Sequence, residues 1–403
     1  MDARNSLREA AAQATPWRLL ALLMAMTAIG PAMLNMIVPA LPGLTTKFAT
    51  NPGTLQLTLS VYLLSLATAQ LVLGPLSDRF GRRPVVLAGL SFAVLASLGA
   101  IATSSIGALI AVRIVQAIGA ATGIVMGRAI IRDLFDRDRA AAMIGLVTTA
   151  MVIAPMVSPL IGGILDTAFG WEAIFLFLAT FSAIVLTWAF MVLPETRPAN
   201  VAHTAAGMVQ DTRSLLGSAK FLGYVLAGAL GSAPFFTFIG GGPYVVVTLM
   251  GRSSAEFGMW FAITSLGYMG GNFSVSRLSQ RFGIDAMIAA GIVFELIGAG
   301  LTVILMAVTP DAGPAIVFLP QVVISYGNGL LLPNAIAGAV SVRPQAAGTA
   351  AGMTGFTQMS IGAASTQIVS VLLSHFTTAM PMAWMLLALV VATAVAFGLL
   401  ARR

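Results

Sequence analysis

Charged residues are scarce in this sequence. Only 9% of its 403 residues are Asp, Glu, Lys or Arg, whereas about 25% is usual in a soluble domain. So few charges cannot cover the surface of a water-soluble globule of this length, and that class is excluded. Apolar residues make up 58% of the chain and occur in runs long enough to cross a bilayer as helices. The sequence therefore predicts an all-α membrane protein.

Cysteine is absent, and there are only two histidines. Disulfides, thiol chemistry and Cys-ligated metals are therefore excluded. His203 and His375 lie outside the apolar runs, with no partner at ligand spacing, and are expected to be solvated loop residues. The spans contain no nucleophile–base set, so we expect no metal, no cofactor and no enzymatic activity.

The chain has a net charge of +7, and the positions of its basic residues indicate the membrane topology. The basic residues sit in short stretches between apolar runs without interleaved aromatic residues, so nucleic acid is not an expected partner. With the N-terminus placed in the cytoplasm, only Lys47 and Arg252 of the 21 Lys and Arg residues fall on the opposite side, while Arg113 and Arg128 lie inside spans. The positive-inside rule thus predicts that both termini are cytoplasmic.

Twelve apolar runs are separated by short polar segments. We predict a cytoplasmic tail at 1–16, a six-helix bundle at 17–193, a cytoplasmic linker at 194–219 and a second six-helix bundle at 220–403. The first run is too long for a signal-peptide core and is expected to be an uncleaved span. The predicted spans are Trp17–Ala40, Leu55–Leu76, Pro84–Ala102, Ile106–Ile131, Ala140–Leu165, Trp171–Leu193, Phe221–Leu249, Phe257–Ser276, Ile284–Val308, Ala312–Val340, Gly348–Leu373 and Pro381–Ala401.

The two halves share a short repeat. Residues 76–81 read LSDRFG after the second run, and residues 278–283 read LSQRFG after the eighth. Two like halves related by an axis along the membrane normal are typical of a transporter, with the solute site between them near mid-membrane.

The first copy lies within GPLSDRFGRRP at 74–84. Gly74 is expected to permit close helix contact, and Gly81 a left-handed turn. Asp78 can cap or pair at a helix N-terminus, while the cluster of Arg79, Arg82 and Arg83 can pair with acids on the cytoplasmic face. On mechanics alone, a gating role and a tight turn carrying topogenic charge remain equally open.

This segment resembles the signature loop of the major facilitator superfamily. RIVQAIGAA at 113–121 is similar to the fourth-helix motif of its drug/proton antiporters, with Ala117 where Gly is usual. QLTLSVY at 56–62 and RAIIRDLF at 128–135 resemble the Bcr/CflA branch, which includes bicyclomycin and chloramphenicol exporters. The antiporter motif of the fifth helix is matched, with Ala154 in place of its Gly, by Pro155, Pro159, Gly162 and Gly163.

The resemblance implies twelve transmembrane helices in two pseudo-symmetric six-helix bundles and alternating access. It implies proton-coupled efflux of small amphipathic drugs, hence multidrug and antibiotic resistance, from a bacterial inner membrane. The expected partners are a small-molecule substrate, protons and the lipid bilayer, and we expect a monomer. Asp78, Arg79 and Arg82 would help to hold the outward-facing state, with Asp133 or Asp136 as partner. Gln280 stands in the place of Asp78 in the second half, so a matching lock there must be weaker.

Arg113 lies within the fourth span. An Arg in hydrocarbon costs roughly 3 kcal/mol on insertion scales, so it should face the bundle interior. Gln116, one turn further, can line the same face. The resemblance favours a role near the proton or solute site, and the alternative is a structural Arg bonded to backbone carbonyls. Arg113 could also be the charge partner of one specific polar or anionic solute, which is the alternative function.

Two residues bear on proton coupling. Many relatives carry Asp at the place of Asn35, and an amide cannot carry a proton. If Asn35 replaces the proton carrier, coupling must move elsewhere or be lost; the alternative is that Asn35 merely bonds a neighbouring helix. Glu295 is the only mid-span carboxyl and is the default proton carrier, although a protonated Glu295 bonded to a neighbour explains it equally well. Further candidates along the solute pathway are Tyr62, Gln70, Asn328 and Gln358.

Overall fold

The computed structural model describes residues 16–135, 137–196 and 212–401. In these ranges the chain forms helices and turns and contains no strand. The described residues pack into two units. Of the described residues, unit 1 draws on 16–36, 65–135, 137–158 and 169–196, and unit 2 on 37–64, 159–168 and 212–401. Two long helices, α4 (Pro52–Phe80) and α7 (Arg137–Phe169), contribute to both units.

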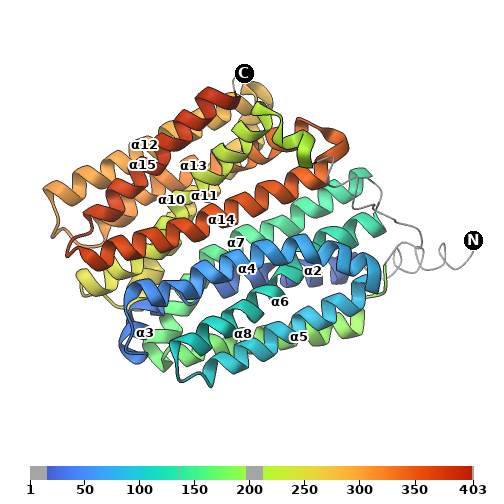
Figure 1. Cartoon of the computed structure of the whole chain (residues 1–403), viewed down its shortest axis with the longest axis horizontal. Helices are drawn as coiled ribbons and strands as arrows, with labels where there is room; N and C mark the ends of the chain where they lie inside the picture. Colours follow the sequence, from blue (N-terminus) through green and yellow to red (C-terminus); the bar gives the residue numbers. More distant parts are fainter. Residues whose placement is uncertain (1–15, 136, 197–211, 402–403) are drawn as a thin grey trace, which may run out of the picture. The chain divides into compact units, whose positions relative to one another are not determined.

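Unit 1 is a set of packed apolar helices. Besides parts of α4 and α7 it contains α2 (Pro16–Asn35), α5 (Arg82–Ile101), α6 (Ile106–Leu134) and α8 (Trp171–Val192). α6 packs against α2 and α5, and α5 against α8 (Figure 1). Glycine allows α6 to pack closely against α2, because a Cβ at Gly123 would lie 2.0 Å from the carbonyl oxygen of Met26. Short turns and small residues thus bring these helices into backbone contact.

Unit 2 contains most of the remaining helices. It begins with the 3₁₀ turn η1 (Val38–Ala40), α3 (Leu41–Lys47) and the first part of α4. The elements that follow residue 218 are α10 (Ala219–Pro243), the π-helix η2 (Tyr244–Leu249), α11 (Ser254–Phe282), α12 (Ile284–Val308), α13 (Ala315–Ser341), η3 (Pro344–Ala346), α14 (Ala347–His375), α15 (Met380–Ala396) and the π-helix η4 (Phe397–Ala401). α13 packs against α10, α11 and α12, and α10 against α14 and α15.

Local sequence explains where helices begin. Ser105, Ser218 and Ser253 each accept a hydrogen bond from the backbone N–H three residues later, as N-cap residues do. Gly81 and Gly283 precede α5 and α12 with φ of 101° and 80°. Such angles favour glycine, so the chain can reverse direction within a single residue.

Eleven described helices are long and apolar enough to cross a membrane. The predicted span Phe257–Ser276 lies within α11, which has 29 residues but is less apolar than the others. The first span differs from its prediction. α2 ends at Asn35, and helical structure resumes in η1 and α3 through Lys47. Pro39 and Pro42 lack the N–H that a continuous helix would need, so the helix breaks before them.

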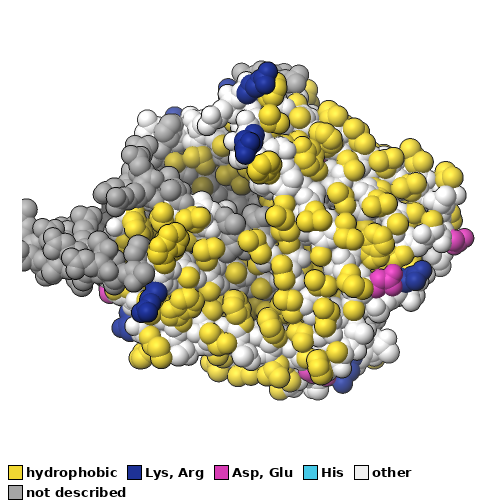
Figure 2. Space-filling view, turned by 180° about the vertical axis from the view of Figure 1, so that it is seen from behind, with side chains coloured by type: hydrophobic (Ala, Val, Ile, Leu, Met, Phe, Trp, Pro, Cys, Tyr) yellow, Lys and Arg dark blue, Asp and Glu magenta, His cyan; other side chains and the backbone are white. Residues whose placement is uncertain are grey.

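The surface is largely apolar. Figure 2 shows hydrophobic side chains over most of one face, with few charged ones. Phe169, Met191 and Val308 are 76%, 75% and 72% exposed. Side chains of this kind exposed in such number would be unfavourable in water and are suited to hydrocarbon.

The predicted linker lies only partly within the described residues. Residues 212–216 are helical, and Leu215 is buried in a core cluster with Phe221 and Tyr224. The predicted domain boundaries remain a prediction.

Candidate functional site

The turn between α4 and α5 consists of Gly81 alone. Its φ of 101° and ψ of 155° confirm the expected need for glycine. Space requires it too, because a Cβ there would lie 2.6 Å from Oε2 of Glu195. A Cβ at Gly74 would meet no atom within 4 Å in the described structure, so the expected close helix contact at that position stays a prediction.

Arg82 organises the charged cluster beside this turn. Its Nη1 lies 2.6 Å from Oδ1 of Asp78, and its Nε lies 2.9 Å from Oδ2 of Asp133. Nη1 also donates to Oγ of Ser77. The side chains of Arg82 and Asp133 are 9% and 10% exposed, so little water competes for this pair. Asp133 is thus one of the two predicted partners, while Asp136 lies outside the described residues.

Glu195 was missed as a site residue. Its Oε1 accepts from the backbone N–H of Arg82 at 2.8 Å, and its Oε2 from that of Arg83 at 3.2 Å. A carboxylate therefore covers the open N–H groups at the start of α5, where the helix dipole favours negative charge. Its signal in the sequence was an acid directly after the sixth span.

The other two arginines of the cluster contact aromatic residues. Arg83 donates from Nη2 to the carbonyl of Phe190 at 2.8 Å, and its guanidinium lies 5.5 Å from that ring's centroid. Within the described residues the Arg83 side chain thus packs on the end of α8, while its backbone N–H contacts the acid Glu195. The guanidinium of Arg79 lies 5.2 Å from the ring centroid of Phe80.

The second copy of the loop has a similar backbone turn but different side-chain contacts. Gly283 again separates two helices, with ψ of 163°. Ser279 donates to Oδ1 of Asn334 at 2.8 Å. The hydroxyl of Tyr224 donates to Oδ1 of Asp285 at 2.6 Å. The position equivalent to Arg82 is Ile284, so the second loop cannot reproduce the ion pairs of the first.

Arg113 is completely buried in unit 1, as predicted for an Arg facing the bundle interior. Its Nη1 donates to the carbonyl of Met33 at 2.9 Å and to Oε1 of Gln116. The amide of Gln116 donates to Oγ of Ser97 at 2.8 Å. The network therefore joins α2, α5 and α6, and it includes the backbone carbonyl contact expected of a structural Arg.

Asn35 is the last residue of α2 and is 1% exposed. Its Nδ2 donates to the carbonyl of Pro31 at 2.8 Å, and its Oδ1 has no hydrogen-bond partner among the residues that the structure describes. The bond stays within its own helix, so the expectation that Asn35 bonds a neighbouring helix is wrong. Because its side chain is an amide, Asn35 cannot serve as a proton carrier.

Glu295 is on α12 and is completely buried where this helix packs against α13. Its Oε1 lies 3.4 Å from Nδ2 of Asn328, which also donates to the carbonyl of Gly231 at 2.8 Å. Within the described part of the chain, Oε2 has no hydrogen-bond partner. Gly327 makes the approach possible, because a Cβ there would lie 2.8 Å from Cγ of Glu295. The structure thus brings together two predicted site residues, Glu295 and Asn328.

The antiporter motif on α7 packs closely at its end in unit 2. A Cβ at Gly163 would lie 2.3 Å from the carbonyl oxygen of Ser254, and one at Gly258 would lie 2.5 Å from that of Pro159. Gly162 is buried, and Pro155 lies half-buried in unit 1. Glycine at 163 is therefore needed for the backbones of α7 and α11 to touch.

The remaining pathway candidates are distributed between the units. Unit 1 contains Asn35, Gln70, Arg113 and Gln116, and unit 2 contains Tyr62, Glu295, Asn328 and Gln358. Tyr62 is completely buried, and Gln70 and Gln358 are half-buried. A solute site shared by all of them remains a prediction.

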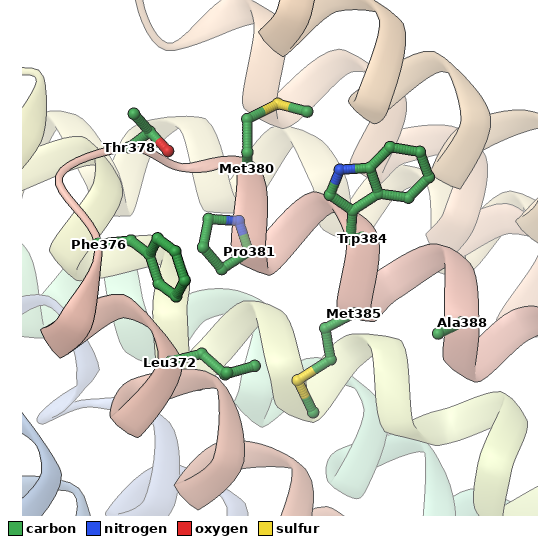
Figure 3. Close-up of a pocket in the computed structure, with 8 residues that line it drawn as sticks. All are labelled: Leu372, Phe376, Thr378, Met380, Pro381, Trp384, Met385 and Ala388. Carbon is green, nitrogen blue, oxygen red and sulfur yellow. The ribbon is translucent and has the colours of Figure 1, made fainter.

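An apolar groove of about 500 Å³ lies where α14 ends and α15 begins (Figure 3). Its eight lining residues are Leu372, Phe376, Thr378, Met380, Pro381, Trp384, Met385 and Ala388. Phe376 and Trp384 are 54% and 56% exposed. Among the lining side chains only Thr378 and the indole N–H of Trp384 are polar, so the groove lacks the convergent polar groups that orient a bound solute.

The arrangement of helices matches solved membrane transporters. A bacterial homologue of the human lysosomal transporter Spinster, in an inward-facing and occupied conformation, aligns with a TM-score of 0.75 at 15% identity over 94% of this chain and 95% of that one. A POT family transporter in complex with 5-aminolevulinic acid aligns with a TM-score of 0.76 at 13% identity over 96% and 95%. The likeness shows the fold of a multi-pass membrane transporter.

The family follows from sequence. Residues 23–366 match the model of the Major Facilitator Superfamily. Multidrug resistance protein D of Escherichia coli is 32% identical over 84% of each chain, and a chloramphenicol resistance protein of Pseudomonas aeruginosa is 32% identical over 78% of this chain and 72% of its own length. A bicyclomycin resistance protein homologue of Haemophilus influenzae is 28% identical over 93% of each. The chain belongs to the major facilitator superfamily, in the Bcr/CflA drug antiporter branch, and is a transporter rather than an enzyme.

Proposed function

We propose that this transporter exports small amphipathic antibiotics, of the bicyclomycin and chloramphenicol kind, in exchange for protons. The observation that carries the proposal is its similarity, over most of each chain, to relatives named for resistance to these drugs. The names of these relatives do not favour the alternative function, a transporter of one specific polar or anionic solute that uses Arg113.

The protein acts in the bacterial inner membrane as a monomer, with both termini in the cytoplasm. The distribution of Lys and Arg residues supports this orientation. It places the Arg82 cluster on the cytoplasmic side and the contact between Gly163 and Ser254 near the outer side. The contact between Gly163 and Ser254 joins the first predicted bundle to the second, so alternating access requires this contact to break and re-form.

The Arg82 cluster is the cytoplasmic lock. Its ion pairs tie the start of α5 to the ends of α4 and α6. Glu195 adds the segment after α8 by capping α5. Because removal of one partner would leave nearly buried charges uncompensated, this cluster favours one defined arrangement of the cytoplasmic ends of these helices.

Glu295 carries the coupled proton. It is a completely buried carboxyl, and one of its oxygens has no hydrogen-bond partner in the described structure. A carboxyl can bind and release a proton when access from one side allows. The amide of Asn328 connects it to the carbonyl of Gly231 on α10. A change of charge at Glu295 therefore alters contacts between α10, α12 and α13.

Transport by everted vesicles tests these assignments. A pH gradient, acidic inside, should drive bicyclomycin accumulation, and an ionophore that collapses the gradient should abolish it. Glu295→Gln should remove the response to the gradient while leaving drug binding in place. Glu256→Gln, at the first turn of α11, is the matched control and should behave as wild type. Accumulation that ignores the gradient in wild type would contradict proton coupling, and normal coupling in Glu295→Gln would contradict the carrier assignment.

A further inference from the structure

Unit 2 contains a contact between segments that are far apart in sequence. Residues 37–64 and 159–168 belong to the first predicted bundle, at 17–193, yet they pack with α10, α11 and α14. We call this contact the seam. Its members are Pro39, Gly53, Ser60, Gly163 and Thr167 on one side and Ser254, Ala255, Gly258 and Gln367 on the other.

Gln367 on α14 makes the most complete contact of the seam. Its Nε2 donates to the carbonyl of Gly53 at 2.8 Å, and its Oε1 accepts from the hydroxyl of Ser60 at 2.9 Å. One amide therefore engages the first turn of α4 with its donor and a point two turns further with its acceptor. Ser60 is only 8% exposed, so water competes little for that bond.

Other seam contacts reinforce the same closure. The hydroxyl of Ser254 donates to the carbonyl of Pro39 at 3.0 Å, and the N–H of Ala255 donates to Oγ1 of Thr167 at 3.2 Å. Each of these hydrogen bonds joins two uncharged groups. The close approach at Gly163 leaves no room for a side chain between α7 and α11. Separation of the two sides therefore requires the bonds of Gln367 to break.

We propose that Gln367 is a positioning residue of the transport cycle, whose amide holds α4 against α14 and releases both bonds whenever this end opens. The proposal rests on the alternating-access cycle proposed above. The family motifs do not include Gln367, and no charge is needed for its action. The amide of Gln367 thus sets the balance between the closed and open forms of the seam.

A buried serine offers a reporter of opening. Ser370 is 5% exposed and lines a cavity of about 30 Å³ together with Gln56 and Tyr244, between α4 and α10. The chain has no cysteine, so Ser370→Cys introduces a single thiol. In lipid nanodiscs, a bulky water-soluble maleimide should react with this thiol only while the seam is open, and the rate should measure the open fraction.

In the Ser370→Cys background, Gln367→Met keeps the length of the side chain and removes both bonds. The labelling rate should rise about tenfold, because each neutral hydrogen bond contributes roughly fivefold to the closed form and the losses partly overlap. Ser60→Ala, on the opposite side of the seam, should raise it about threefold to fivefold. Ser374→Ala is the matched control, since that hydroxyl bonds only the carbonyl of Val371 in its own helix.

The unfolding temperature of each variant separates the possible roles. A residue that merely stabilised the fold would lower this temperature without changing the labelling rate of the folded protein. Unchanged labelling in Gln367→Met and Ser60→Ala would overturn the proposal, as would an equal rise in Ser374→Ala. If Gln367→Met does not fold, the labelling rate of Ser60→Ala tests the proposal instead. The readout needs no drug, so a failure of the proposed export would leave this result standing.

Discussion

The two copies of the repeated loop share a backbone and differ in what holds them. Gly81 and Gly283 have φ of 101° and 80° and each separates two long helices. Around Gly81 an arginine binds two carboxylates and a glutamate caps the next helix. Around Gly283 the contacts are those of Ser279 with Asn334 and of Tyr224 with Asp285. The two halves thus share the turn, and the ion pairs occur at the first.

Removal of Arg82 should have the largest effect on this comparison. Arg82→Ala leaves Asp133 nearly buried without its cation, and the loss should be about 3–4 kcal/mol of unfolding free energy. Ile284→Ala, at the equivalent place in the second loop, should lose about 1 kcal/mol because it removes only part of a half-buried side chain. Denaturant titration in mild detergent measures both. Equal losses would show that the first loop is not held by its charges.

Substitution of the two loop glycines should have the next largest effect. Gly81→Ala and Gly283→Ala both force a side chain into a backbone region that suits only glycine, which costs about 1–3 kcal/mol. At position 81 the new Cβ must also displace the carboxylate of Glu195, whereas at 283 it meets no atom within 4 Å. Gly81→Ala should therefore lower the unfolding temperature more than Gly283→Ala. The reverse order would mean that Glu195 does not cap α5.

Tyr224→Phe should weaken the second loop moderately. It removes the hydroxyl that donates to Asp285 at 2.6 Å and should lose about 1–2 kcal/mol, as expected for a hydrogen bond to a charged group. The same denaturant titration checks this value. An effect as large as that of Arg82→Ala would contradict the view that the second loop is held more weakly.

Gln280→Asp should have the smallest effect. It restores the acid of the first loop, but Ile284 supplies no cation for it, so stability should change by less than about 0.5 kcal/mol. The double variant Gln280→Asp/Ile284→Arg, which supplies that cation, should be more stable than Ile284→Arg alone. No gain in the double variant would show that residues beyond the pair, such as Asp133, are essential to the lock.

Much of the fold could be predicted because the apolar runs define it. Their number, the single-residue turn at Gly81 and the burial of Arg113 all follow from keeping charges and open backbone groups out of hydrocarbon. The break after Asn35 was not predicted, although Pro39 and Pro42 were visible, because the run of apolar residues continues through them.

The site was less predictable because its contacts join distant residues. The ion pair of Arg82 with Asp133 was anticipated only through family resemblance. Glu195 could not be assigned as a cap, since nothing in the sequence brings it beside α5. Gln367 bonds residues more than 300 positions away, and an amide in an apolar helix does not indicate its partner.

The most direct test of drug/proton exchange uses sealed proteoliposomes loaded with bicyclomycin and diluted into drug-free buffer, with a pH-sensitive dye in the lumen. Efflux of drug through the wild-type protein should draw protons inward and acidify the lumen, and Glu295→Gln should abolish the acidification. Drug efflux through the wild-type protein with no change in lumen pH would contradict the account.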